Sequence, residues 1–181
     1  ECSIGLVPDV GSTFYLAQAP GRTGEYLAVT GDRMDAADAI FAGFADHFVP
    51  NADWATLKAQ LCETGTTSAI AHLAKHPERS RLARWQADID RIFNATSLSQ
   101  IDANLSANDS PAALHARKLM SNNAPLAMAI TINVIQAVRR EPNVANALDR
   151  EFRYTFRSVA QGDFVEGIRA AIIDKDRNPK W

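Results

Sequence analysis

The sequence predicts a mainly α-helical protein, and three observations lead to this fold class. From residue 51 to the C-terminus, apolar side chains recur every three or four positions, which is the spacing of one helix face. Glycine, proline and cap residues divide these runs into lengths typical of short helices. Strand-like composition occurs only over residues 44–49, directly before Pro50. We therefore expect many helices and one short strand.

The first twelve residues interrupt the helical pattern and present two carboxylates, Glu1 and Asp9. Gly5 and Pro8 prevent a continuous helix, so both carboxylates lie on a bent backbone. A helix is expected over residues 10–18, which places Asp9 at or near a helix N-terminus, where the helix dipole favours an ionised carboxylate. From spacing alone, the simpler interpretation is that Asp9 only caps this helix and Glu1 is only an exposed residue.

Two short helices are expected before the strand. Thr23 can cap a helix that ends at Gly31, and Asp35 can cap another over Ala36–Ala42. The strand that follows contains His47. A lone histidine without a second ligand nearby in the sequence is usually structural or simply exposed, so we assign it no function.

Eight further helices are expected after residue 50. They begin near Trp54, Thr67, Ser80, Ser97, Pro111, Pro125, Asn143 and Asp163. The one over Leu126–Arg139 is apolar nearly all round and should be the most buried. The next is long and amphipathic, ends at Gly162, and carries an apolar stripe of Leu148, Phe152, Phe156 and Val159.

Apolar stripes of this kind normally mean core packing. The helix that begins near Ser80 carries Trp85 and Phe93 on such a stripe. We therefore assign both rings to the core rather than to the wall of a ligand cavity.

Composition narrows the class of protein. The chain is 46% hydrophobic and 22% charged, which is ordinary for a globular domain. A net charge of -2 without a basic run gives no reason to expect nucleic-acid binding, and no apolar stretch is long enough to span a membrane. Cys2 and Cys62 are too few for a disulfide framework or a metal site. We expect a reducing, cytoplasmic setting and no metal.

Several motifs stand out in the first part of the chain and near its C-terminus. In the first part of the chain they are Glu1-x-x-Ile4-Gly5-Leu6-x-Pro8-Asp9-Val10-Gly11, Glu25-Tyr26-Leu27-Ala28-Val29-Thr30-Gly31 and Ala42-Gly43-Phe44-Ala45. Near the C-terminus they are Gly162-Asp163-Phe164-x-Glu166-Gly167-x-Arg169-Ala170 and Asp174-Lys175-Asp176-x-x-Pro179-Lys180-Trp181. Together these motifs resemble the crotonase superfamily, also called the enoyl-CoA hydratase/isomerase superfamily. The second set is most similar to its 3-hydroxyisobutyryl-CoA hydrolase subfamily.

The resemblance implies a fold and a division of the chain. The expected fold is the C-terminal part of a crotonase-type α/β fold, the ββα spiral. Residues 1–50 would complete its core and carry the catalytic carboxylates, and residues 51–181 would form a helical extension. Because the sequence opens in mid-motif and without Met, we expect a fragment that lacks the N-terminal half of this fold.

The resemblance also implies roles for individual residues. Glu1 would be the base or nucleophile, and Asp9 would position the substrate hydroxyl or the water. Gly5, Val10 and Lys175 would contact the substrate. Lys175, Arg177 and Lys180 could reach the phosphates of coenzyme A, although a solvated charged tail is the commoner explanation. Both oxyanion-hole donors of the family lie upstream of Glu1, so the chain alone is expected to be inactive. Coenzyme A is part of the substrate, and no cofactor is expected.

Position 9 and the C-terminus favour one activity among relatives. Hydratases of the family generally carry Gly where this chain has Asp9, whereas hydrolases and dienoyl-CoA isomerases carry Asp. The long C-terminal part and its Pro179-Lys180-Trp181 ending then favour hydrolysis of a short branched 3-hydroxyacyl-CoA, as in valine catabolism. The alternatives are an enoyl-CoA hydratase, a dienoyl-CoA isomerase or a non-catalytic helical assembly module.

The expected partners follow from the same reasoning. They are an acyl-CoA substrate and either further copies of the chain or its missing N-terminal segment, with no nucleic acid and no membrane. Self-association is expected because the apolar faces of Ile4, Leu6, Phe14 and Phe48 would lack their usual cover. The compartment is expected to be cytoplasmic, or the mitochondrial matrix in a eukaryote.

Overall fold

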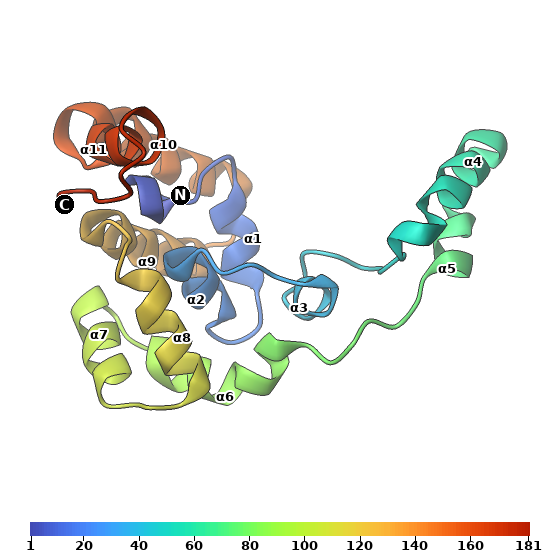
Figure 1. Ribbon diagram of the computed structural model, residues 1–181, viewed down its shortest axis with the longest axis horizontal. Coiled ribbons are helices and arrows are strands. Elements are labelled where there is room, and N and C mark those ends of the chain that lie inside the picture. Colours follow the sequence, from blue (N-terminus) through green and yellow to red (C-terminus); the bar gives the residue numbers. More distant parts are fainter. The chain divides into compact units, whose positions relative to one another are not determined.

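The computed structural model describes residues 1–181 and consists of helices joined by loops, with extended connections on either side of α4 and α5 (Figure 1). The α-helices are α1 Ser12–Gln18, α2 Thr23–Thr30, α3 Ala36–Phe41, α4 Trp54–Thr64, α5 Ser68–Leu73, α6 Arg81–Phe93, α7 Leu98–Ser106, α8 Pro111–Met120, α9 Pro125–Arg140, α10 Val144–Gln161 and α11 Phe164–Ile168. Two short 3₁₀ helices, η1 Cys2–Ile4 and η2 Asn51–Asp53, and a π-helical turn, η3 Arg169–Ile173, complete the structure. The mainly helical prediction is confirmed.

The predicted strand over residues 44–49 is wrong. Only an isolated antiparallel bridge forms, between Phe48 and Lys75. The N–H groups of Phe44 and Ala45 instead donate to the carbonyl of Ala39 at the end of α3. A strand needs a neighbouring strand to pair its backbone groups, and this segment has none.

The chain folds as two compact units. The first unit contains Glu1–Arg33 and Trp85–Trp181, and the second contains Met34–Arg84. The predicted boundary at residue 50 lies inside the second unit. Compact units and the predicted division are different ways to divide the chain. The division into a catalytic core piece over 1–50 and an extension over 51–181 stays a prediction.

In the first unit, α9 is the central helix. It packs against α1, α2, α7 and α10, which surround it in Figure 1. Its buried residues are Ala127, Met128, Thr131, Ile132, Val134, Ile135 and Val138. It has more buried residues than α7, α8 or α10, as predicted for the most buried helix after residue 50.

Helix α2 packs against α1 and is buried along its whole length. The two helices approach so closely that a side chain at Gly24 would collide with the carbonyl of Leu16. Glu25 is also fully buried, and its carboxylate pairs with Arg22 at 2.9 Å and with Arg139 at 2.8 Å. These two ion pairs compensate the cost of burying its charge and connect α2 to α9.

Four helices begin at a side-chain cap. The side chains of Asp35, Ser97, Ser110 and Asn143 each accept a hydrogen bond from a backbone N–H in the first turn of the following helix. Thr23 does not cap α2, because it is already the first helical residue and Arg22 occupies the cap position without a side-chain bond.

In the second unit, buried Asp38 organises the backbone between α3 and α6. Its Oδ1 accepts hydrogen bonds from Ser80 Oγ at 2.7 Å and Leu82 N at 2.9 Å, and its Oδ2 lies 3.4 Å from an Arg81 nitrogen. Helices α4 and α5 pack on each other, and no residue of α4 is buried. His47 is exposed.

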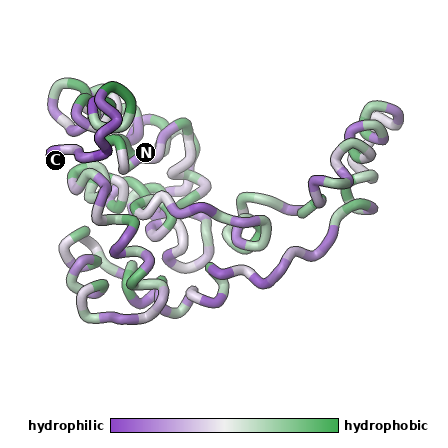
Figure 2. Tube along the Cα trace, viewed as in Figure 1, coloured by the Kyte–Doolittle hydropathy of each residue, from purple (hydrophilic) through white to green (hydrophobic).

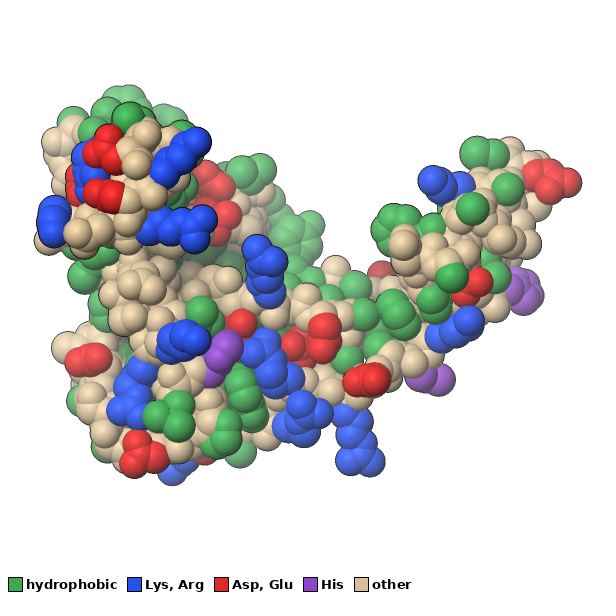
Figure 3. All heavy atoms as spheres, viewed as in Figure 1, with side chains coloured by type: hydrophobic (Ala, Val, Ile, Leu, Met, Phe, Trp, Pro, Cys, Tyr) green, Lys and Arg blue, Asp and Glu red, His purple; other side chains and the backbone are tan.

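Apolar stripes pack in two different ways. On α6, Phe93 is buried as predicted, together with Leu82, Ile89 and Ile92, whereas Trp85 is half-buried. On α10, the apolar stripe of Leu148, Phe152, Phe156 and Val159 is exposed. Figure 2 shows how closely apolar and polar residues alternate along the helices, and Figure 3 shows apolar side chains at the surface near α10 and α11.

The predicted exposed patch therefore lies elsewhere than expected. Ile4, Leu6, Phe14 and Phe48 are half-buried, and the large exposed apolar side chains gather on α10 instead. No helix combines the length and apolar character that crossing a bilayer requires.

Candidate functional site

The segment that carries the candidate carboxylates is anchored at its first turn. The carbonyl of Glu1 accepts hydrogen bonds from Ile4 N at 3.0 Å and Leu6 N at 3.1 Å, which close η1. The carbonyl of Cys2 accepts from Ala124 N at 2.9 Å, directly before α9. The start of the chain is therefore held by the central helix of the unit.

The Cys2 side chain is part of this anchor. It is buried, and its Sγ lies 3.5 Å from both the Ala28 carbonyl and Thr131 Oγ1. Burial raises the pKa of the Cys2 thiol. The thiol is thus kept neutral and acts as a packing group rather than as a nucleophile.

Gly5 is required by the backbone around it. It has a φ of 79°, and a Cβ at this position would lie 2.6 Å from the carbonyl carbon of Asp163. Its carbonyl accepts a hydrogen bond from Tyr154 Oη at 2.8 Å. Burial, and then the charge of Asp163, raise the pKa of Tyr154 to about 12, so this donor stays protonated.

The second end of the segment is held by a residue of α10. Buried Glu151 accepts hydrogen bonds from Gly11 N at 2.8 Å, from Thr13 N at 3.1 Å and from the Thr13 hydroxyl. These are unpaired donors of the α1 N-terminus, which need an acceptor from outside the helix. Glu151 therefore supplies the cap that the sequence suggested for Asp9.

Asp9 is consequently not the helix cap. Gly11 occupies the cap position with a φ of 82°, and only the backbone carbonyl of Asp9 is used, by Ser12 N at 3.0 Å. The carboxylates of Glu1 and Asp9 form no hydrogen bond or ion pair within the chain. Both are therefore available to an external group.

Val10 is placed beside Asp9 in a strained conformation. It has a φ of 57° although it is β-branched, and its side chain is 87% exposed. Such a backbone conformation costs of order 1–3 kcal/mol and persists only where the surroundings impose it. Here the bonds from Gly11 and Thr13 to Glu151 impose it, and they turn Val10 outward.

Glu1 lines a cavity of about 420 Å³. The other lining residues are Cys2, Ser3, Thr30, Gly31, Lys118, Leu119, Asn122 and Asn123. The last turn of α8 thus brings an ammonium, and the loop after it brings two amide groups, to the same cavity as the Glu1 carboxylate. Asp9, Val10 and Gly5 do not line it.

Lys118 and Asn122 were not found by sequence reasoning. They lie more than a hundred positions after Glu1 and belong to no motif. Their position depends on the hydrogen bond between Cys2 and Ala124, which places the loop after α8 beside the first turn. Only a long-range contact could reveal them.

The C-terminal tail reaches the same neighbourhood through Arg177 rather than Lys175. Arg177 and Pro179 line a second cavity, of about 370 Å³, together with Ser3, Ile4 and Asn122. Lys175 is exposed, with a φ of 57°, and lines neither cavity. The predicted substrate contact of Lys175 therefore has no counterpart in these two cavities.

Arg169 fixes the tail. Its guanidinium pairs with Glu166 at 2.8 Å, Asp174 at 2.7 Å and Asp176 at 2.8 Å. The hydrogen bonds from Arg169 and, after it, from the Lys180 N–H lower the pKa of Glu166 to about 2. No group of three or more histidine, cysteine, aspartate or glutamate side chains is arranged to hold a metal ion.

Comparison with known proteins gives consistent matches over the whole chain. Residues 1–181 match the family model described as enoyl-CoA hydratase/isomerase. A probable 3-hydroxyisobutyryl-CoA hydrolase from Arabidopsis thaliana is 33% identical over 196 residues, which cover 100% of this chain and 52% of the relative. A mitochondrial 3-hydroxyisobutyryl-CoA hydrolase from Dictyostelium discoideum is 32% identical, with 100% and 50% covered.

A solved structure agrees with the helical arrangement. The crystal structure of an enoyl-CoA hydratase from Rhodobacter sphaeroides 2.4.1 is 49% identical and superposes with a TM-score of 0.91, over 100% of this chain and 52% of that one. The chain thus spans about half the length of the proteins it matches.

Proposed function

Since the chain belongs to the enoyl-CoA hydratase/isomerase family, we propose that it carries part of the active site of an acyl-CoA thioester hydrolase. The substrate would be a short branched 3-hydroxyacyl-CoA of the 3-hydroxyisobutyryl type, as in valine catabolism. The observation that carries this proposal is the pair of unpaired carboxylates, Glu1 and Asp9, on a segment held at both ends. The names of the relatives from Arabidopsis and Dictyostelium support it.

Glu1 is the base or the nucleophile in this proposal. As a base, it takes a proton from water while the water oxygen bonds to the thioester carbonyl carbon. The C–S bond then breaks, the thiolate takes a proton and leaves as coenzyme A, and the 3-hydroxy acid remains. Asp9 orients the substrate hydroxyl or the water, and the exposed Val10 beside it contacts the acyl group.

The surroundings of Glu1 suit an anionic substrate. Lys118 lies in the same cavity, and Arg177 lies in the neighbouring one that shares Ser3 and Asn122. Coenzyme A carries phosphates, which arginine and lysine bind through charge-assisted hydrogen bonds. Gly5 contributes by allowing the close approach to Asp163 rather than by contact through a side chain. Coenzyme A enters as part of the substrate, and no separate cofactor is proposed.

The test is a pair of substitutions in the intact protein. Glu1→Gln should lower kcat for 3-hydroxyisobutyryl-CoA hydrolysis by roughly 10²- to 10⁴-fold, the usual contribution of a general base, and leave binding of the CoA ester largely intact. Asp9→Asn and Asp9→Gly should each lower hydrolysis. Wild-type rates for Glu1→Gln would overturn the assignment.

A hydratase is the second candidate, because the Rhodobacter protein, at 49% identity, is described as an enoyl-CoA hydratase. The two activities can be separated by assaying the same preparation for thioester hydrolysis and for hydration of a short enoyl-CoA. Asp9→Gly should lower the first and admit the second. Faster hydration than hydrolysis by the unmodified protein would favour the hydratase.

We further propose that α10 is covered in the functional assembly, by another copy of the chain or by a segment corresponding to the rest of the relatives' length. Leu148 lies at the edge of the exposed stripe, and a Cβ at Gly11 would lie 3.8 Å from its Cδ2. Whatever covers the stripe therefore approaches Asp9. The proposed compartment is the cytoplasm, or the mitochondrial matrix in a eukaryote, as in the name of the Dictyostelium relative.

A further inference from the structure

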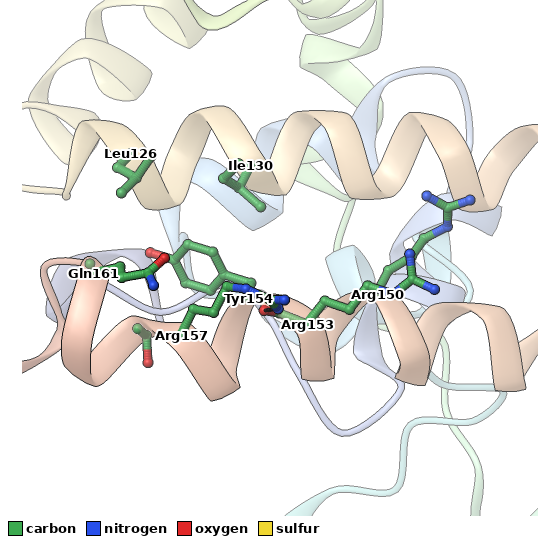
Figure 4. Close-up of a pocket in the computed structure, with 9 residues that line it drawn as sticks. Leu126, Ile130, Arg150, Arg153, Tyr154, Arg157 and Gln161 are labelled. Atoms are coloured by element: carbon green, nitrogen blue, oxygen red, sulfur yellow. Dashed lines mark hydrogen bonds between the residues drawn. The ribbon is translucent and has the colours of Figure 1, made fainter.

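A third cavity, of about 330 Å³, lies between α9 and α10 and shares no residue with the one that Glu1 lines. Its lining residues are Leu126, Ile130, Arg150, Arg153, Tyr154, Arg157, Ser158, Gln161 and Gly162. Figure 4 shows Leu126 and Ile130 extending from α9 toward α10, with the ring of Tyr154 between the two helices. One wall is therefore apolar, and the other carries most of the polar groups.

Three arginines line the α10 side of this cavity. Arg150, Arg153 and Arg157 are three and four positions apart, so they lie along one flank of the helix. Like charges at this spacing repel one another. This repulsion is small because Arg153 and Arg157 are exposed, and a bound anion relieves it.

Only one of the three arginines is neutralised by the protein. Arg153 pairs with Asp149 at 2.6 Å. Arg150 Nε donates to the side-chain amide oxygen of Asn146 at 2.8 Å, and Arg157 Nη1 donates to the carbonyl of Arg153 at 2.7 Å. These two bonds hold both guanidinium groups in place through neutral acceptors and leave two positive charges at the cavity.

We propose that this cavity binds an organic phosphate with a small apolar group. Guanidinium groups recognise phosphate through paired hydrogen bonds, and Arg150 and Arg157 supply the charge. The apolar group packs on Leu126 and Ile130, and a volume of about 330 Å³ accommodates one ring or a short acyl chain with its phosphate.

The site is also connected to the segment that carries Asp9. Tyr154, whose ring lines the cavity, donates its hydroxyl hydrogen to the Gly5 carbonyl at 2.8 Å. A ligand beside this ring therefore touches one of the groups that hold residues 1–12. The inference does not rest on the proposed hydrolase activity, because no residue assigned to catalysis lines the cavity.

Isothermal titration calorimetry with phenyl phosphate tests the proposal in the purified protein. The double variant Arg150→Gln with Arg157→Gln should weaken binding at least tenfold. Arg84→Gln is the control for a lost charge, because Arg84 is an exposed helical arginine outside the cavity, and it should leave affinity unchanged. Glu1→Gln should also leave it unchanged, which separates this site from the proposed catalytic one.

The apolar part is tested by a second comparison. Ile130→Ser should weaken phenyl phosphate severalfold and leave binding of inorganic phosphate unchanged, with thermal unfolding followed by circular dichroism to verify that the variant is folded. If the wild type binds phenyl phosphate and inorganic phosphate with equal affinity, the apolar group does not contribute to binding, and the proposal of an organic ligand is wrong. If phenyl phosphate does not bind saturably, or if Arg84→Gln loses as much affinity as the double variant, the cavity is not the phosphate site.

Discussion

Helices α9 and α10 have similar lengths and both carry large apolar side chains, yet they use their apolar sides in opposite ways. In α9, residues such as Ile132 and Ile135 are completely buried. In α10, Phe152 is 64% exposed and Phe156 is 71% exposed, whereas the polar Glu151 is buried. Periodicity thus predicts that a helix has two sides but not which side faces the protein.

Glu151 explains the orientation of α10. The N-terminus of α1 presents donors at Gly11 and Thr13 that need an acceptor, and Glu151 provides it. The small residues Ala147 and Ser158 lie on the same side of α10 and are buried with it. Because Glu151 must face the N–H groups of Gly11 and Thr13, the apolar stripe with Phe152 and Phe156 lies on another side of α10. No other part of the chain covers it there.

The largest effect is expected for Glu151→Ala. It removes the acceptor of two buried N–H groups and one hydroxyl, each of which costs about 1–3 kcal/mol when unsatisfied. We expect a loss of roughly 3–5 kcal/mol in the free energy of unfolding, measured by urea denaturation. Glu141→Ala, at an exposed position after α9, should change it by less than about 0.5 kcal/mol. A loss below 1 kcal/mol for Glu151→Ala would contradict the proposed cause of the orientation.

The core of α9 should be almost as sensitive, and the stripe of α10 should not be. Ile135→Ala should cost about 2–5 kcal/mol because it opens a cavity in a fully buried position. Phe156→Ala removes a larger side chain but should change the stability of the monomer by less than about 0.5 kcal/mol. Similar losses for the two variants, in parallel denaturation curves at low protein concentration, would show that the stripe is covered.

A smaller effect is expected on self-association. If two copies cover each other's stripe, Phe152→Glu combined with Phe156→Glu should weaken the association at least tenfold, or about 1.4 kcal/mol. Sedimentation velocity over a range of concentrations measures this. Lys58→Glu, an exposed change on α4, is the control, and a monomeric wild-type protein at all concentrations would exclude the dimer.

The smallest effect concerns the exposed tail after α11. The pKa of Glu166 falls from an ordinary 4.5 to about 2, chiefly through its bond to Arg169. The contribution of this pair is therefore complete above about pH 4.5 and is lost as the pH falls toward about 2. The Lys180 amide resonance should shift over this range, and Glu166→Gln should abolish the shift. An unchanged titration in the variant would assign it to another group.

Local signals predicted much of the fold. Asp35, Ser97 and Asn143 cap helices where the sequence places helix starts, and Gly31 ends α2 with a positive φ. These features depend on bonds within one turn, so nearby residues determine them. The strand over residues 44–49 was wrong, because strand formation depends on a partner that the local sequence does not specify.

The candidate site divides in the same way. The motif around Glu1 and Asp9 was visible in the sequence, as was the bend imposed by Gly5 and Pro8. The role of Glu151 as the cap of α1, in place of Asp9, was not visible, because 140 positions separate it from Gly11. Lys118 was hidden for the same reason.

The sequence by itself therefore determined the helices, their ends, the family and the presence of two carboxylates on a bent segment. The tertiary structure alone decided which side of α10 is inward, which acceptor completes α1 and which cations lie near Glu1. The physical reason is that helix formation is governed by interactions over three or four residues, whereas buried donors must find an acceptor wherever packing provides one.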